Sequence, residues 1–91
     1  MIEYKPAIVS HPGRIVAREL RARGMRRREL AAITGWPLEF WDSFIDDEAV
    51  VSTADGRREL ADALSRAFGT PAALWLSLQH NYDAYREQRP N

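Results

Sequence analysis

The sequence of 91 residues contains no cysteine, which excludes disulfide bonds and thiolate chemistry. No apolar run approaches the roughly 20 residues that a membrane-spanning helix requires. Residues 1–11 also lack the long apolar segment of a secretory signal. A chain of this length makes one domain with a small core. We expect it in the reducing cytoplasm, with no membrane partner.

The residue patterns of common active sites are absent as well. There is no glycine-rich phosphate loop, and no Ser-His-Asp or Cys-His arrangement. The two histidines, His11 and His80, have no partners at metal-ligand spacing, and the acidic run 46–48 lacks the glycine and late glutamate of a calcium loop. We therefore expect no catalytic residue, no metal site and no cofactor.

Charge cancels over the whole chain but is strongly segregated along it. The formal net charge is zero, which argues against strong nonspecific binding to nucleic acid. Residues 1–36 carry eight basic and three acidic side chains, whereas residues 37–56 carry six acidic and no basic ones. Such segregation indicates two regions that attract partners of opposite charge.

Helical periodicity, with its Gly and Pro boundaries, predicts an all-α fold in a single domain over residues 1–91. A short extended arm is expected at 1–9 and a frayed tail at 86–91. The five expected helices lie at about 12–23, 26–34, 37–46, 57–68 and 71–85.

Local signals also predict helix caps and buried faces. Ser10 or His11 is expected to cap the first helix, with His11 as a helix-entry element, and Ser52 or Asp55 to cap the fourth. Leu30, Ala31 and Ile33 are expected to face inward on the second helix. On the fifth helix, one stripe is expected to consist of Leu74, Trp75, Leu78, Tyr82 and Tyr85.

Residues 26–46 have the layout of a helix-turn-helix motif, with two short helices around a turn at Gly35. In such motifs the first helix crosses the DNA backbone and the second enters the major groove. The basic cluster Arg26-Arg27-Arg28 is therefore a candidate for phosphate contact. Two alternatives stay open, because the cluster could be a solvated helix start and Arg28 could be an internal ion-pair partner.

The second helix of the motif lacks base-reading side chains. Major-groove readout uses Arg or Lys on guanine and Asn or Gln on adenine. The six carboxylates of residues 37–56 would also repel phosphates. We expect DNA binding to be weak, near the nonspecific range of about 10⁻⁴–10⁻⁶ M. The side chains available here for base contact are Pro37, Leu38, Glu39, Phe40 and Ser43.

The same helix fits a protein-contact surface better. Its buried side is predicted to consist of Trp41, Phe44 and Ile45. An apolar centre with an acidic rim is typical of protein contacts, although the connector 47–56 could instead fold over it and bury it. The residues expected to face outward in this partner surface are Leu38, Glu39, Phe40 and Asp42.

Aromatic residues near the C-terminus give a second candidate interface. Tyrosine and tryptophan combine large apolar area with a polar group, which suits oligomer contacts. We interpret Trp75, Tyr82 and Tyr85 as a stripe of core and interface residues rather than as a cofactor platform. A homodimer is predicted, with Tyr82 and Tyr85 at its interface or in contact with a partner.

Two segments, Ser10–Gly35 and Gly69–Tyr82, resemble the HigA-like antitoxins, small XRE-type helix-turn-helix proteins of toxin–antitoxin modules. The resemblance implies a lambda-repressor-like bundle of five helices, neutralisation of a HigB-like ribonuclease toxin, and repression of its own operon by a DNA-bound dimer. The acidic, aromatic recognition helix favours an alternative, a protein-interaction module or regulator that has lost sequence-specific DNA binding. The matching residues are His11, Pro12, Gly13, Glu19, Leu20, Arg23, Gly24, Arg28, Glu29, Leu30, Ala31, Gly35, Gly69, Thr70, Trp75, Leu76, Leu78, Gln79, Asn81 and Tyr82.

Overall fold

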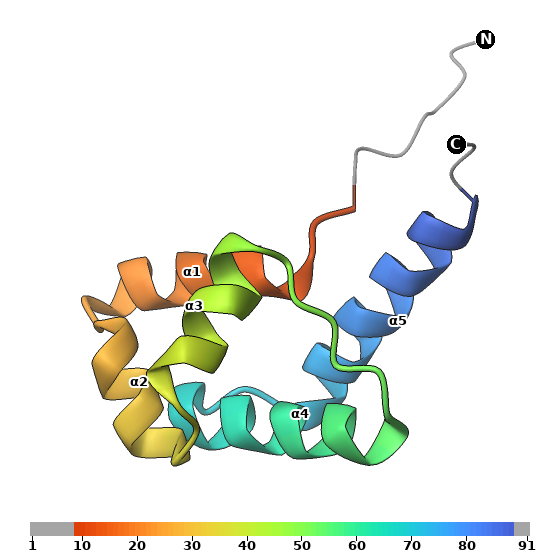
Figure 1. Ribbon diagram of the computed structural model, residues 1–91. Helices are drawn as coiled ribbons and strands as arrows, with labels where there is room; N and C mark the ends of the chain where they lie inside the picture. The colour runs from red at the N-terminus through yellow and green to blue at the C-terminus, as the bar shows by residue number, and fades with distance from the viewer. Residues whose placement is uncertain (1–8, 89–91) are drawn as a thin grey trace, which may run out of the picture.

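Five α-helices make up the part of the chain that the computed structural model describes, residues 9–88, and this part contains no strand (Figure 1). α4 packs along α5, α1 contacts α3 and α5, and α2 lies against α3 and α4. The all-α, five-helix fold expected from the sequence is confirmed. The arm predicted for residues 1–9 lies, except for Val9, outside the described residues. The helices are α1 (Pro12–Arg23), α2 (Arg27–Thr34), α3 (Leu38–Asp46), α4 (Ala54–Phe68) and α5 (Ala72–Gln88).

One hydrophobic core joins the five helices. Each large apolar side chain buried in it contributes about 1.5–3 kcal/mol to folding. Trp41 and Phe44 are fully buried and Ile45 packs half-buried against them, so the predicted inner side of α3 is confirmed. The buried members of the core are Val16, Leu20, Leu30, Trp41, Phe44, Leu60, Ala61, Leu64, Phe68 and Trp75.

Ile33, which was expected to face inward, and Leu74, which was expected in the stripe of the fifth helix, are both largely exposed. Ile33 is 49% exposed and Leu74 is 43% exposed, while Thr34 and Gln79 are buried. A buried polar side chain must find a hydrogen-bond partner. The Thr34 hydroxyl donates to a carbonyl one turn earlier at 2.8 Å, and the Gln79 amide donates to Asp83 at 3.0 Å. Both polar side chains therefore have a hydrogen-bond partner. A hydrophobic pattern does not mark these two positions as buried.

The largest differences from the expected helix bounds are at the start of α4, which begins at Ala54 rather than at about residue 57, and at the end of α5. The N-cap of α4 is Thr53, whose hydroxyl accepts the Gly56 N–H at 2.9 Å, so the expectation of Ser52 or Asp55 is wrong. α5 continues to Gln88, which makes the expected start of the tail at residue 86 wrong. Among the described residues, no helix is both long enough and apolar enough to span a bilayer.

Candidate functional site

α2 and α3 form a helix pair at the predicted helix-turn-helix position. Gly35 permits the turn between them because its backbone is left-handed, with φ at 75°. The buried Thr34 hydroxyl accepts the Trp41 indole N–H at 3.3 Å, which ties the end of α2 to the inner side of α3. Trp41 therefore fixes which side of α3 faces solvent.

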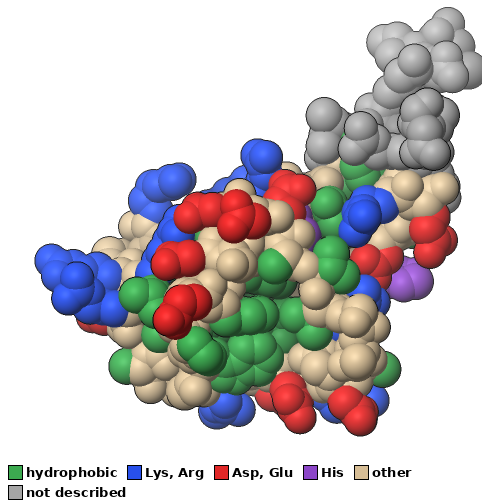
Figure 2. All heavy atoms as spheres, in the orientation of Figure 1, with side chains coloured by type: hydrophobic (Ala, Val, Ile, Leu, Met, Phe, Trp, Pro, Cys, Tyr) green, Lys and Arg blue, Asp and Glu red, His purple; other side chains and the backbone are tan. Residues whose placement is uncertain are grey.

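The solvent-facing side of α3 carries apolar and acidic side chains together. Leu38 is 40% exposed and Glu39 is exposed, so the connector does not cover this side. Phe40, expected to point outward, is half-buried: its ring stacks on Phe44 at 5.5 Å and meets Trp36 edge-on at 4.8 Å between ring centroids. In Figure 2, acidic side chains over α3 border a hydrophobic area.

One arginine of the basic cluster is bound within the helix pair. Arg27 bonds Asp42 at 2.9 Å and both carboxylate oxygens of Asp46 at 2.9 Å. These bonds raise the pKa of the Arg27 guanidinium and hold the pKa of the Asp46 carboxyl below its usual value. The internal partner is thus Arg27, whereas sequence suggested that role for Arg28. Phosphate contact by the basic cluster stays a prediction. Arg26 and Arg28 are better placed than Arg27 to make this contact.

Removing this guanidinium is expected to release the Asp46 carboxyl. In Arg27→Gln, the pKa of Asp46 should rise toward its ordinary value of 3.8, because the hydrogen bond from Arg27 is the largest cause of its lowering. Carboxyl carbon NMR titration measures this pKa directly. Arg28→Gln, a matched change one residue away, should leave it unaltered; an unchanged Asp46 pKa in Arg27→Gln would mean that the observed ion pair does not persist in solution.

The remaining candidates for DNA contact lie around the two helix starts. Arg26 and Arg28 are exposed, and the Arg26 backbone N–H donates to the Glu29 carboxylate at 2.7 Å. Pro37, the N-cap of α3, is exposed, and Ser43 is half-buried. Ser43 is therefore poorly presented as a base-reading group, which leaves the outer side of α3 without a neutral polar side chain.

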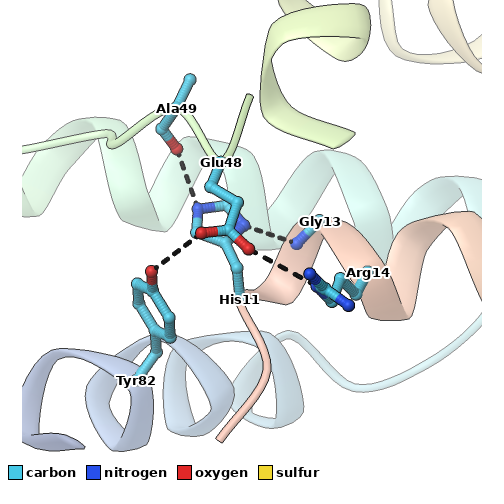
Figure 3. A network of polar contacts seen from close by, with 6 residues as sticks. All are labelled: His11, Gly13, Arg14, Glu48, Ala49 and Tyr82. Atoms are coloured by element: carbon cyan, nitrogen blue, oxygen red, sulfur yellow. Dashed lines mark hydrogen bonds and ion pairs between the residues drawn. The ribbon is translucent and has the colours of Figure 1, made fainter. Parts of the chain in front are cut away.

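A second cluster of polar contacts lies where α1 begins (Figure 3). His11 is buried and caps α1: its Nδ1 accepts the Gly13 N–H at 2.9 Å and its Nε2 donates to the Ala49 carbonyl at 2.9 Å. These two bonds require a neutral ring with its proton on Nε2. Burial is the largest cause of a lowered His11 pKa. The predicted helix-entry role of His11 is confirmed.

Glu48 holds the connector against this cluster in an unusual backbone conformation. Its φ is 53°, a left-handed value that is uncommon outside glycine. The conformation lets the Ala49 N–H reach back to the Ser43 carbonyl at 3.2 Å at the end of α3. The Glu48 carboxylate pairs with Arg14 at 3.4 Å and accepts the Tyr82 hydroxyl at 3.3 Å. No sequence signal marked Glu48.

The two candidate interface regions do not form one surface. Tyr82 and Tyr85 are half-buried on α5 and line a groove of about 390 Å³ beside His11 and Glu48. Tyr82 also meets the His11 ring edge-on at 5.0 Å. Leu38 instead lies in the first turn of α3, at the far end of that helix from Glu48. A homodimer through the two tyrosines stays a prediction.

Neither a metal-ligand cluster nor a match to a known protein helps to identify the function of the site. Within residues 9–88, no group of three or more His, Cys, Asp or Glu side chains could hold a metal ion. No protein-family model matches the chain, and no curated protein matches it. Function is therefore inferred from the geometry and from the residue pattern of the chain.

Proposed function

We propose that this chain is an antitoxin-type helix-turn-helix protein that binds and neutralises a toxin protein, with the outer side of α3 as its contact surface. The resemblance of Ser10–Gly35 and Gly69–Tyr82 to HigA-like antitoxins supports the toxin as partner, a small HigB-like ribonuclease. The proposal assigns α3 to protein contact rather than to base recognition.

The composition of the outer side of α3 is the observation that carries the proposal. The outer side of α3 carries the exposed Leu38 together with Glu39 and the partly exposed carboxylates of Asp42 and Asp46. The half-buried Phe40, two positions from Leu38, lies on a different side of the helix and packs against Trp36 and Phe44. Apolar side chains at the centre of an interface supply most of its affinity. The acidic rim would speed association with a basic protein and exclude acidic ones.

Sequence-specific repression is less well supported. α3 presents no Arg, Lys, Asn or Gln to a base edge. Arg27, the cation nearest to the α3 carboxylates, is already engaged by Asp42 and Asp46. A DNA phosphate approaching α3 would therefore meet three carboxylates and a single arginine whose charge is already shared between two of them. We accordingly expect little preference for the protein's own promoter.

The partner surface can be tested with two matched leucine variants. Co-expression with the product of the neighbouring gene, which we expect to be a small basic protein, should yield a complex, and calorimetry can measure its affinity. Leu38→Arg should weaken that complex by about tenfold or more, because it places a cation and a longer side chain at the interface centre. Leu74→Arg, a change at a similarly exposed leucine on α5, should weaken it less than threefold.

Three results would contradict the proposal. Failure of the wild-type chain to bind the neighbouring gene product would remove the toxin as partner. A tight footprint on a palindrome upstream of the gene, lost on substitution of Leu38 or Glu39, would assign α3 to base recognition. Equal loss of affinity in the two leucine variants would show that α3 is not the contact surface.

A further inference from the structure

A surface groove of about 380 Å³ lies where the connector and the start of α4 meet the middle of α5, and we call it the α4–α5 groove. Figure 1 shows the connector passing α5 on its way into α4. The volume is within the range of about 300–1,000 Å³ that is typical of ligand sites. Among the described residues that line the groove, two are arginines and none is acidic. The lining includes Ser52, Arg57, Arg58, Leu76, Gln79 and His80.

The groove contains a nearly buried amide with an unused acceptor. Gln79 is only 5% exposed, and its Nε2 group donates to Asp83 at 3.0 Å. Its Oε1 atom makes no hydrogen bond within residues 9–88. Every fully buried side-chain nitrogen or oxygen of those residues has a partner, so Oε1 reaches solvent. A nearly buried carbonyl oxygen without a partner favours a ligand that brings an N–H group.

The groove also offers a positive charge that is not neutralised. Arg58 is exposed and forms no ion pair among the described residues. Arg57 is held in place instead, because its Nε donates to the Val51 carbonyl at 2.6 Å and its Nη1 pairs with Asp83 at 2.6 Å. Asp83 thereby connects Arg57 to Gln79 and fixes both side chains. An unpaired guanidinium beside this fixed pair is suited to binding a carboxylate.

We propose that the α4–α5 groove binds an extended acidic peptide segment of a partner protein. A peptide supplies a backbone N–H for the Gln79 oxygen and a side-chain carboxylate for Arg58. An aliphatic side chain of the peptide would cover Leu76, which is 39% exposed. Ser52 and His80, both exposed, add a hydroxyl and an imidazole that can donate hydrogen bonds to an anionic ligand.

Other anions fit the groove less well. An inorganic phosphate or a small free carboxylate at Gln79 would place one acceptor against another and leave Leu76 uncovered. Single-stranded nucleic acid binds through aromatic side chains on which its bases stack, and none of the described lining residues is Phe, Tyr or Trp. The combination of an apolar side chain, an acceptor and a cation therefore favours a peptide.

This groove is a second interaction site and does not depend on the proposed toxin. Its residues come from the connector, α4 and α5, whereas the protein-contact surface is the outer side of α3. The two sites also differ in charge, with carboxylates on α3 and arginines in the groove. A basic partner should therefore favour α3, and an acidic segment should favour the groove.

Fluorescence anisotropy of the full chain with a labelled peptide of alternating leucine and glutamate tests the proposal. Arg58→Glu should weaken binding about tenfold, because it reverses the charge that faces the peptide. The matched change Arg66→Glu lies at an exposed arginine about 12 Å further along α4. It should weaken binding less than about twofold, because that distance exceeds the screening length of about 8 Å at physiological salt. Circular dichroism checks that both variants fold.

Two further comparisons test the acceptor and the carboxylate separately. Gln79→Met keeps the approximate size of the side chain but removes the acceptor, and it should weaken binding about fivefold. The salt dependence of binding should persist in Gln79→Met and fall in Arg58→Glu. A peptide of alternating leucine and glutamine should bind the wild-type chain about tenfold more weakly than the glutamate peptide does.

Four outcomes would overturn the proposal. The first is no binding of the glutamate peptide by the wild-type chain at low salt. The second is an equal loss in Arg58→Glu and Arg66→Glu, which would reflect net charge rather than the groove. The third is equal affinity for the glutamate and glutamine peptides. The fourth is tighter binding of a labelled oligothymidylate that Arg58→Glu abolishes, which would assign the groove to single-stranded nucleic acid. None of these outcomes bears on toxin binding by α3.

Discussion

Gly13→Ala is expected to destabilise the fold by about 3 kcal/mol, near the upper end of overpacking effects. A Cβ at Gly13 would lie 2.0 Å from the carbonyl oxygen of Phe44 and 2.9 Å from its carbonyl carbon. Both are backbone atoms near the end of α3, so no side-chain rotation can relieve the contact. α1 and α3 would have to separate, which loosens packing around the fully buried Phe44. Guanidinium denaturation followed by circular dichroism measures the change.

Gly56 gives a matched control in the first turn of α4. A Cβ there would meet the Thr53 hydroxyl at 2.7 Å and a Val51 methyl at 2.9 Å. Both are side-chain atoms rather than backbone, but turning the Thr53 hydroxyl away costs its capping bond to the Gly56 N–H, about 1 kcal/mol. Alanine also favours the helix by roughly 0.5–1 kcal/mol over glycine. Gly56→Ala should therefore change stability by less than about 1 kcal/mol. Equal effects of the two substitutions would show that the α1–α3 approach is not tight.

The sequence correctly predicted those helix bounds that are marked by residues at the ends of the helix itself. The predicted first helix and α1 have the same bounds, because Pro12 and Gly24 mark its ends. The cap of α4 was missed because Ser52, Thr53 and Asp55 all carry capping side chains within a few residues. Packing chooses among them, and the Arg57 Nε–H bond to the connector carbonyl at residue 51, at 2.6 Å, helps to fix the register.

The candidate site was predictable only in part, because its contacts join distant residues. The acidic character of α3 and its buried Trp41 follow from composition and period. The ion pairs of Arg27 link residues 15 and 19 positions apart, so they depend on the angle between α2 and α3. Without that angle, the sequence does not show whether Arg27 or Arg28 forms the ion pairs with α3. The left-handed backbone of Glu48 likewise has no local signature, since glycine is the usual residue there.

Stability is expected to fall as the pH is lowered below 6.5, because His11 must remain neutral in the folded chain. Its folded pKa lies below the ordinary histidine value of 6.5, mainly through burial. The Ala49 carbonyl, Glu48 and Asp83 act to raise it and Arg86 to lower it, but burial outweighs them. Between the two pKa values the unfolded chain binds more protons, so folding loses up to about 1.4 kcal/mol per pH unit. Above pH 6.5 this effect vanishes.

His11→Asn separates this effect from other titrations. Asparagine can still cap α1, but it loses the Ala49 bond and the ring contacts with Phe44 and Tyr82. The variant should lose about 2 kcal/mol at pH 7.5 and should show a flat pH profile between 6.5 and 5. His80→Asn, at an exposed position on α5, should keep the wild-type slope.

Proton NMR of the wild-type His11 ring provides a second, direct measurement that needs no variant. The ring should titrate below 6.5, since protonating Nδ1 removes the acceptor for the Gly13 N–H and charges a buried group. Asp46 does not interfere, because its pKa is lowered from 3.8 and its contribution is lost only at lower pH. A His11 pKa at or above 6.5, or an unchanged slope in His11→Asn, would mean that the start of α1 does not require the neutral ring.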